Sequence, residues 1–208
     1  YLSSPEWMQA TWTSVKAALG TLLVATPVGV AAAYGLHTSR FRGVRVVYML
    51  LITPMIVPVI LLAIGTFYVY ARLQLLNTIP GLVLAHSVMA IPLVLIVVGA
   101  GLKSFDMDLE MAARNLGASR LRAFMKVTLP QIRYSVITAA LLAFLTSFDE
   151  VVIALFISGG ENSTLTRNMF NALRDQIDPT ITAISTLLIV ITTALMIAAQ
   201  FFGKARQT

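Results

Sequence analysis

The sequence predicts an all-α protein that crosses a membrane several times. Of its 208 residues, 58% are hydrophobic and only 12% are charged, which is about half the charged share of ordinary soluble domains. The apolar residues form uncharged runs of the ~20 residues that a helix needs to cross a bilayer core. These runs lack the alternating polar residues of membrane-spanning β-strands. A soluble fold is therefore excluded, and a polytopic helical membrane protein is indicated.

Five runs are long enough to cross, and each is predicted to be a helical span. In chain order they are Ala17–Leu36, Val46–Ala71, Leu82–Leu102, Tyr134–Ile157 and Pro179–Gly203. Prolines within them, Pro54 and Pro58 included, are expected to interrupt or bend the helices. Between the fourth and fifth runs, Asn168–Gln176 has the composition of a short surface helix.

The basic residues predict how the spans are oriented. Eleven lysines and arginines fall on the side that carries the loop after the first span, and four fall on the other side. Basic residues are retained in the cytoplasm, so the N-terminus is expected outside and the C-terminus inside. The net charge of +6 then reflects topology and predicts no nucleic-acid partner. Because the chain opens with a polar external segment, Tyr1–Thr13, we expect one further span upstream, which would make five of six.

The connection Lys103–Leu129 is predicted to hold two short helices separated by a sharp turn. Leu109–Leu116 has good helix formers, and Gly117 is placed to end that helix in a left-handed conformation. Ser119 can cap the second helix, and Pro130 fits the first turn of the fourth span. Ser104, Asp106 and Asp108 are expected to supply the N-cap and the first-turn acidic residues of the first of these helices. Composition alone leaves open a simpler alternative, an amphipathic segment lying on the membrane.

This connection resembles the cytoplasmic signature of binding-protein-dependent ABC importer permeases. That signature reads Glu-Ala-Ala, three residues, Gly, nine residues, a branched aliphatic residue, one residue, then Leu-Pro. Met111 stands where the family has its glutamate, and Glu110 precedes it. The matching residues are Ala112, Ala113, Gly117, Val127, Leu129 and Pro130.

The resemblance implies a single ABC importer transmembrane domain over residues 1–208, with residues 104–129 as a coupling-helix module. It also implies a homologous permease partner, two ATPase subunits and one extracytoplasmic substrate-binding protein. The module would sit in a cleft of the ATPase, so ATP and Mg would be bound by that partner and no cofactor by this chain. Consistently, the sequence has no phosphate-binding loop motif. The implied coupling residues are Glu110, Met111, Ala112, Ala113, Gly117, Ala118 and Pro130.

A second resemblance narrows the subfamily. Ser147–Phe156, Gly159–Asn162 and Ile177–Thr180 are similar to the second permease subunit of spermidine/putrescine importers. This implies a bacterial plasma-membrane protein that moves a small cationic solute, a polyamine, inward by alternating access. Another small solute in the same importer class is the alternative.

Two other classes of protein fit the sequence less well. An ion-coupled transporter should show repeated halves with paired intramembrane ionisable groups, and no repeat is visible. An intramembrane enzyme needs converging nucleophile, base or metal ligands, whereas this chain has no cysteine and two histidines in different regions. We therefore expect a transport subunit that performs no covalent chemistry.

Adjacent carboxylates within the fourth span are the candidate substrate contacts. Asp149 and Glu150 are costly in a membrane and usually face a cavity or a partner. One of the two is expected to line the translocation path and to offer its charge to a polycation. The alternative is a structural acid that pairs with a group on a neighbouring helix. His86 is expected to be a hydrogen-bonded interior residue.

Overall fold

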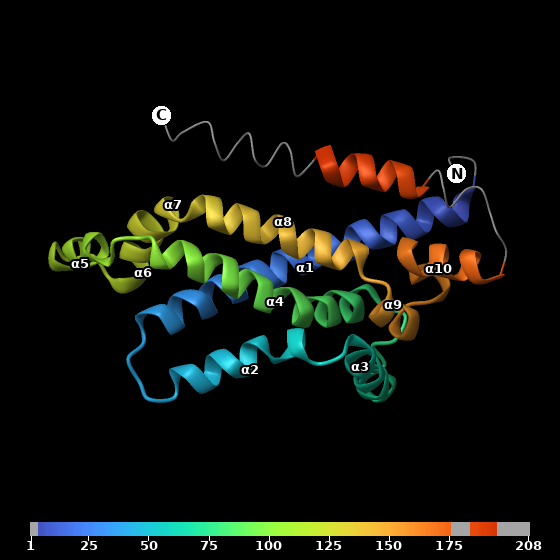
Figure 1. Cartoon of the computed structure of the whole chain (residues 1–208), viewed down its shortest axis with the longest axis horizontal. Helices are drawn as coiled ribbons and strands as arrows, with labels where there is room; N and C mark the ends of the chain where they lie inside the picture. Colours follow the sequence, from blue (N-terminus) through green and yellow to red (C-terminus); the bar gives the residue numbers. More distant parts are fainter. Residues whose placement is uncertain (1–3, 176–183, 195–208) are drawn as a thin grey trace.

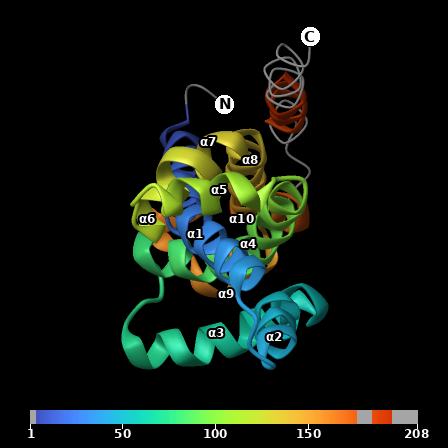
Figure 2. The ribbon, with the colours of Figure 1, turned by 90° about the vertical axis from the view of Figure 1, so that its left-hand side faces the viewer.

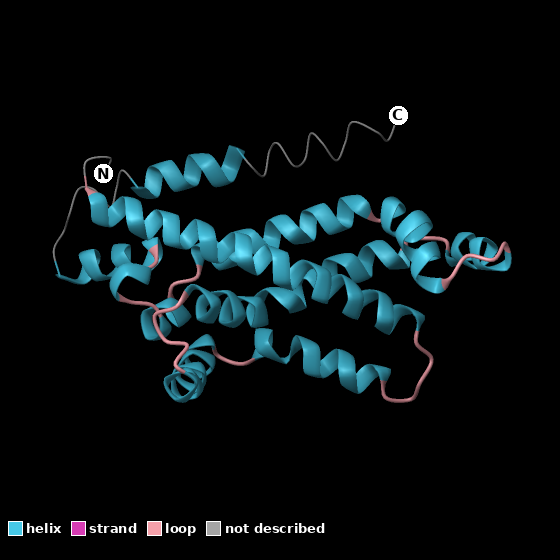
Figure 3. Ribbon diagram, turned by 180° about the vertical axis from the view of Figure 1, so that it is seen from behind, coloured by secondary structure: helices cyan, strands magenta, loops and turns pink. Residues whose placement is uncertain are grey.

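The computed structural model describes residues 4–175 and 184–194, and within these ranges the chain is helical without strands (Figure 3). The elements are α1 Pro5–Thr38, α2 Val44–Ile56, α3 Val59–Leu73, α4 Ile79–Lys103, α5 Met107–Asn115, α6 Arg120–Ala123, the π-helix η1 Phe124–Thr128, α7 Leu129–Gln131, α8 Arg133–Asp149, α9 Val152–Ile157, the 3₁₀-helix η2 Gly160–Asn162, α10 Leu165–Asp175 and a further helix, Ile184–Ala194. The surface helix predicted at Asn168–Gln176 is confirmed as α10, which begins three residues earlier, at Leu165.

Three helices, α1, α4 and α8, form the centre of the bundle and lie side by side (Figure 1). Glycines let α1 and α4 approach closely. A side-chain carbon added at Gly20 would lie 2.4 Å from Val83, and one added at Gly29 would lie 2.5 Å from Val94. A larger residue at either position would push the two helices apart, so small residues set their spacing.

The second predicted span, Val46–Ala71, is divided into α2 and α3, which meet at an angle of 98°. In the end-on view, α3 lies along one side of the bundle and runs across the direction of its long helices (Figure 2). Val57 is extended, with φ −70° and ψ 132°, because the ring of Pro58 disfavours helical geometry in the residue before it. The expected bend is therefore confirmed at Pro58. The predicted span Val46–Ala71 is long enough to cross a membrane only when α2 and α3 are counted together.

The fourth predicted span, Tyr134–Ile157, is also discontinuous. Its main part is α8, and the chain leaves helical geometry at Glu150, where ψ is 122°, before α9 begins at Val152. The interruption coincides with the two carboxylates that the sequence singled out. The acidic pair therefore lies at a break between two helices and not along one helix.

Two of the described helices, α1 and α4, are long and apolar enough to cross a membrane alone, and counting each bent helix pair as one span raises this number to four. The second bent pair joins Arg120–Gln131 to α8 at 80°. The predicted fifth span, Pro179–Gly203, overlaps the helix Ile184–Ala194, and its remainder lies outside the described residues.

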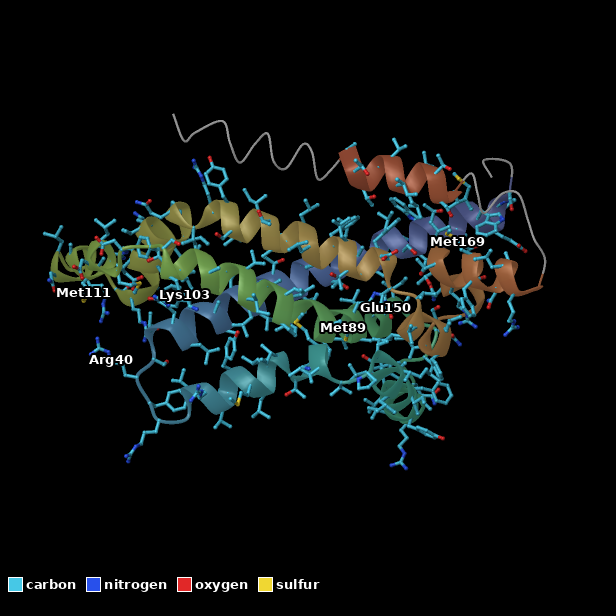
Figure 4. The ribbon with its side chains drawn as sticks, viewed as in Figure 1. Arg40, Met89, Lys103, Met111, Glu150 and Met169 are labelled. Atoms are coloured by element: carbon cyan, nitrogen blue, oxygen red, sulfur yellow. The ribbon has the colours of Figure 1, made fainter. Side chains whose placement is uncertain are left out.

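The bundle has two distinct ends. Helices α5, α6 and α7 lie at one end, called the module end here, together with Arg40 and Lys103 (Figure 4). The opposite end carries the start of α1, α9 and α10. Residues 104–129 are called the helical module from here on.

Candidate functional site

The helical module begins and turns as the sequence predicts. The carboxylate of Asp106 accepts a 2.9 Å hydrogen bond from the backbone N–H of Asp108 and so caps α5. Gly117 follows the helix with φ +92°, a left-handed geometry that is costly for residues with a side chain. The hydroxyl of Ser119 accepts the N–H of Arg122 at 3.3 Å and caps α6. Local signals therefore account for both ends of this turn.

The junction between the module and α8 differs from the prediction. Pro130 was expected in the first turn of the fourth span, but it lies in α7, and α8 begins only at Arg133 after the 80° bend. The N–H of Leu129 reaches back five residues to the carbonyl of Phe124, which makes a wide π-turn. A proline ring conflicts with the carbonyl four residues before it, and a π-turn relieves that crowding. Pro130 thus ends the module at a corner.

Glu110 lies on the buried face of α5, although the sequence placed it among the coupling contacts. Its side chain is 2% exposed. One carboxylate oxygen accepts a 2.5 Å hydrogen bond from the Tyr34 hydroxyl of α1, and the other accepts one from the Thr128 hydroxyl. The ring of Tyr34 also packs against Phe124, with 4.5 Å between centroids. Glu110 therefore ties three helical segments together and is not part of the free surface.

Arg120 makes a second link between the module and α1. Its guanidinium donates a 2.5 Å hydrogen bond to the hydroxyl of Thr38 and lies 5.4 Å from the ring centroid of Tyr34. Because both links reach the last two turns of α1, a displacement of the module would be transmitted to this central helix.

The outer face of the module carries large apolar side chains among its exposed polar ones. Leu116 is 90% exposed and Met111 is 50% exposed, and Met111 lies at the tip of the module end (Figure 4). Of the other residues predicted for coupling, Ala112, Gly117 and Pro130 are exposed, and Ala113 and Ala118 are half-buried. Exposed large apolar side chains grouped in this way are typical of a protein–protein interface.

At the second candidate site, the two adjacent acids have different environments. Asp149 is the last residue of α8 and is exposed. Glu150 is turned back onto the next helix, where its two oxygens accept the backbone N–H groups of Ile153 and Ala154, each at 2.9 Å. A carboxylate at this position satisfies the free donors of the first turn and the positive end of the helix dipole. Glu150 therefore caps α9.

A buried polar cluster connects this break to the bundle core. His86 of α4 is 1% exposed, and its Nδ1 lies 2.7 Å from the hydroxyl of Ser147, which donates to Thr21 of α1 at 3.1 Å. The Nε2 atom of His86 lies 3.8 Å from a carboxylate oxygen of Glu150. His86 is thus a hydrogen-bonded interior residue, as expected. The acid beside it comes from a distant part of the chain, and sequence reasoning did not join the two.

A cavity of about 650 Å³ lies beside the break. Both acids line it, and its opposite wall comes from the helix Ile184–Ala194. The lining residues are Leu145, Thr146, Phe148, Asp149, Glu150, Val151, Leu188, Ile189 and Thr192. Because Glu150 is occupied by the backbone of α9, Asp149 is the carboxylate that is free to meet a cation in this cavity.

The residues that the structure describes contain no group of three or more His, Asp or Glu side chains that could hold a metal ion. The chemistry of the site is therefore that of carboxylates, hydroxyls and one imidazole arranged around a helix break.

Comparison with known proteins covers nearly the whole chain. The family model described as "Binding-protein-dependent transport system inner membrane component" matches residues 25–207. The spermidine/putrescine transport system permease protein PotC of Haemophilus influenzae is 31% identical over 197 residues, which are 95% of this chain and 77% of PotC. The putrescine transport system permease protein PotI of Escherichia coli is 31% identical over 195 residues, with 90% and 69% covered.

The fold is also similar to that of solved transporters. A bacterial ABC transporter involved in the import of the acidic polysaccharide alginate matches with a TM-score of 0.74 at 18% identity, covering all of this chain and 77% of the other. The helices of this chain are therefore arranged as in an ABC importer membrane subunit.

Proposed function

Because the chain belongs to the family of binding-protein-dependent transport system inner membrane components, we propose that it is the permease subunit of an importer for polyamines. A permease of this family works with an ATPase and a binding protein, and it is a transport subunit and not an enzyme. The observation that carries the choice of substrate is the match over most of the chain to PotC and PotI. The exposed carboxylate of Asp149 in a cavity supports it, because a polyamine is a chain of ammonium groups.

In this proposal the helical module is the coupling element that docks on the ATPase. Its outer face supplies the contact, with Leu116 and Met111 as the apolar centre and Ala112, Ala113, Gly117, Ala118 and Pro130 forming the surrounding backbone surface. Glu110, on the buried side of the module, holds α5 against α1 and η1 through its hydrogen bonds with Tyr34 and Thr128. Closure of the ATPase would then move α1 and α8 together, which is how the module would drive alternating access.

Asp149 is proposed as the substrate contact of this chain, and Glu150 as the residue that keeps the adjacent break in place. This assignment rests on the different partners of the two carboxylates: Glu150 caps α9, and Asp149 is exposed at the cavity. The acids at positions 149 and 150 therefore divide binding and positioning between them.

The proposed assembly contains this chain, one homologous permease, two ATPase subunits that bind ATP and Mg, and one extracytoplasmic binding protein. The module end faces the cytoplasm and the opposite end faces outward, with the first described residues outside and the C-terminus inside. Of the eleven basic residues predicted to be cytoplasmic, the nine that the structure describes support this orientation.

Reconstitution of the whole complex tests the proposal. Proteoliposomes would carry ATP inside and the binding protein outside, and uptake of radiolabelled spermidine and putrescine would be measured. We expect uptake to require both ATP and binding protein. Uptake that persists with a hydrolysis-deficient ATPase would contradict an ATP-driven importer. If ATP hydrolysis were stimulated only by binding protein loaded with another solute, the assignment of polyamine as the substrate would be wrong.

A further inference from the structure

A second cavity, of about 610 Å³, lies at the module end, far from the acidic break. The end of α1, the start of α2 and the end of α4 form its walls. Four basic side chains line it: His37, Arg42, Arg45 and Lys103. Lys103 and the loop that carries Arg40 are seen at this end of the bundle in Figure 4.

The positive charge of this cavity is not balanced within the described part of the chain. No aspartate or glutamate is among the lining residues, and no described carboxylate lies within 4.0 Å of the side-chain nitrogens of Arg42, Arg45 or Lys103. Like charges gathered around one cavity repel one another, and a bound anion relieves this repulsion. An anionic group is therefore the ligand that fits the rim.

The rest of the cavity is apolar, which narrows the kind of anion. Its floor is made by Ala33, Leu36, Leu95 and Gly99, and aromatic rings from Phe41 and Tyr48 flank it. The adjoining helix α2 has no fully buried residue, so apolar side chains remain partly exposed beside the cavity. A free phosphate would contact only the basic rim, whereas a phospholipid would also cover the apolar floor with its acyl chains.

We propose that this cavity binds an anionic phospholipid of the inner leaflet, with its phosphate among the four basic residues and an acyl chain beside Leu36 and Gly99. The proposal rests on the proposed function in one respect, because it places the module end at the cytoplasmic leaflet. Basic pockets between membrane helices on this side are well suited to anionic lipid headgroups. The bound lipid would join α2 to α1 and α4 at the end where the module is attached.

The first test removes the charges. The purified complex of all subunits would be incubated in detergent with phosphatidylglycerol or with phosphatidylcholine, and native mass spectrometry would count the lipids retained. Wild type would retain phosphatidylglycerol preferentially. The triple variant Arg42→Gln/Arg45→Gln/Lys103→Gln would lose this preference on the order of a hundredfold, because each cation near an anionic membrane surface contributes about fivefold.

A matched triple variant, Lys16→Gln/Arg40→Gln/Arg72→Gln, removes the same charge from residues that do not line the cavity. It would retain phosphatidylglycerol as wild type does. Equal loss in both triple variants would overturn the proposal, because binding would then follow net charge alone.

The second test fills the apolar floor and keeps the charges. A side-chain carbon at Gly99 would meet no atom within 4 Å, and Gly99 lines the cavity, so Gly99→Leu is chosen to extend an apolar side chain into it. We expect it to lower phosphatidylglycerol retention at least tenfold. Unchanged retention in Gly99→Leu would show that the apolar floor takes no part in binding and would overturn the lipid assignment.

Substrate uptake by the reconstituted complex separates this inference from the proposed function. Normal ATP-driven polyamine uptake with no selective lipid retention would overturn the lipid site alone. Selective lipid retention in a complex that moves no polyamine would overturn the proposed substrate and leave the lipid site standing.

Discussion

The hydroxyl of Tyr34 in α1 lies 2.5 Å from a carboxylate oxygen of Glu110 in α5, beneath the exposed face of the helical module. The carboxylate is buried, and its second oxygen is held by Thr128 at the corner before α8. One side chain of the module thus contacts both the central helix α1 and the segment that leads from the module into α8. This arrangement makes the module and the bundle a single mechanical unit.

Substitution of Tyr34 by Phe removes one donor and leaves a buried carboxylate partly unsatisfied. We expect the free energy of unfolding to fall by about 1–3 kcal/mol, measured by thermal or denaturant unfolding of the purified chain. The triple variant Tyr34→Phe/Glu110→Leu/Thr128→Val replaces every partner by an apolar group and should recover most of the loss. If the triple variant did not regain stability, the three polar groups would contribute more to stability than their mutual hydrogen bonds.

The left-handed residue at Gly117 gives a second prediction. Gly117→Ala should cost about 1–2 kcal/mol, because φ is +92° and left-handed geometry is strained for residues with a Cβ. No atom lies within 4 Å of the added carbon, so the effect would come from the backbone alone. Gly35→Ala, equally free of neighbours but within helix α1, should be neutral or stabilising. Comparable unfolding transitions for both variants would contradict the assigned role.

The acidic pair should separate into a transport effect and a stability effect. Asp149→Asn is expected to reduce polyamine uptake several-fold at normal expression, because the exposed charge at the cavity is lost. Glu150→Gln is expected to lower the free energy of unfolding by about 0.5–2 kcal/mol, the range for a lost helix cap. Uptake assays and thermal unfolding of both variants would distinguish these effects. Undiminished uptake in both, with normal expression, would exclude the pathway role.

Removal of the His86 imidazole should destabilise the buried polar cluster. His86→Leu leaves Ser147 without that partner, and we expect a loss of about 1–3 kcal/mol by thermal unfolding. Ser87→Ala is the control in the next position of α4, because Ser87 is also buried and its hydroxyl donates to the carbonyl of Val83 in its own helix. A greater loss for Ser87→Ala than for His86→Leu would contradict the importance of the cluster.

The exposed module surface predicts a binding defect without a folding defect. Leu116 is 90% exposed, so Leu116→Ser should leave the unfolding transition within about 0.5 kcal/mol of wild type. It should still reduce co-purification of the ATPase and the stimulation of ATP hydrolysis. Leu73→Ser, at a 61% exposed position outside the module, should retain the ATPase. Equal retention by both variants would remove Leu116 from the interface.

Local chemistry explains which parts of the fold could be predicted from the sequence. The cap at Asp106, the turn at Gly117 and the cap at Ser119 depend on residues within four positions of one another, and all three were predicted. The bend at Pro58 was likewise expected, because a proline restricts the residue before it whatever the rest of the fold does. The uncharged run Leu82–Leu102 predicted α4 to within three residues at each end, whereas α1 begins at Pro5, twelve residues before the predicted span, and includes the charged residues Glu6 and Lys16.

Contacts between distant residues could not be predicted in the same way. The sequence places Glu110 among the coupling residues, because nothing in its neighbourhood shows that Tyr34 approaches it from another helix. His86 and Glu150 lie in different predicted spans, and only the packing of α4 against α8 and α9 brings them together. The family signature indicated where the module would lie, and it held no information about Glu110, whose position in the signature is shifted by one.

The π-turn at Phe124–Thr128 means that the orientation of the module is encoded in the number of residues as well as in their identity. Because this turn holds one residue more than an α-helical turn, deleting a single residue from it would restore α-helical spacing and rotate everything before it by about 100° relative to α8. Glu110 would then be carried away from Tyr34, even though every other side chain of the module remained. An alanine scan would pass over this dependence, and a one-residue deletion would reveal it.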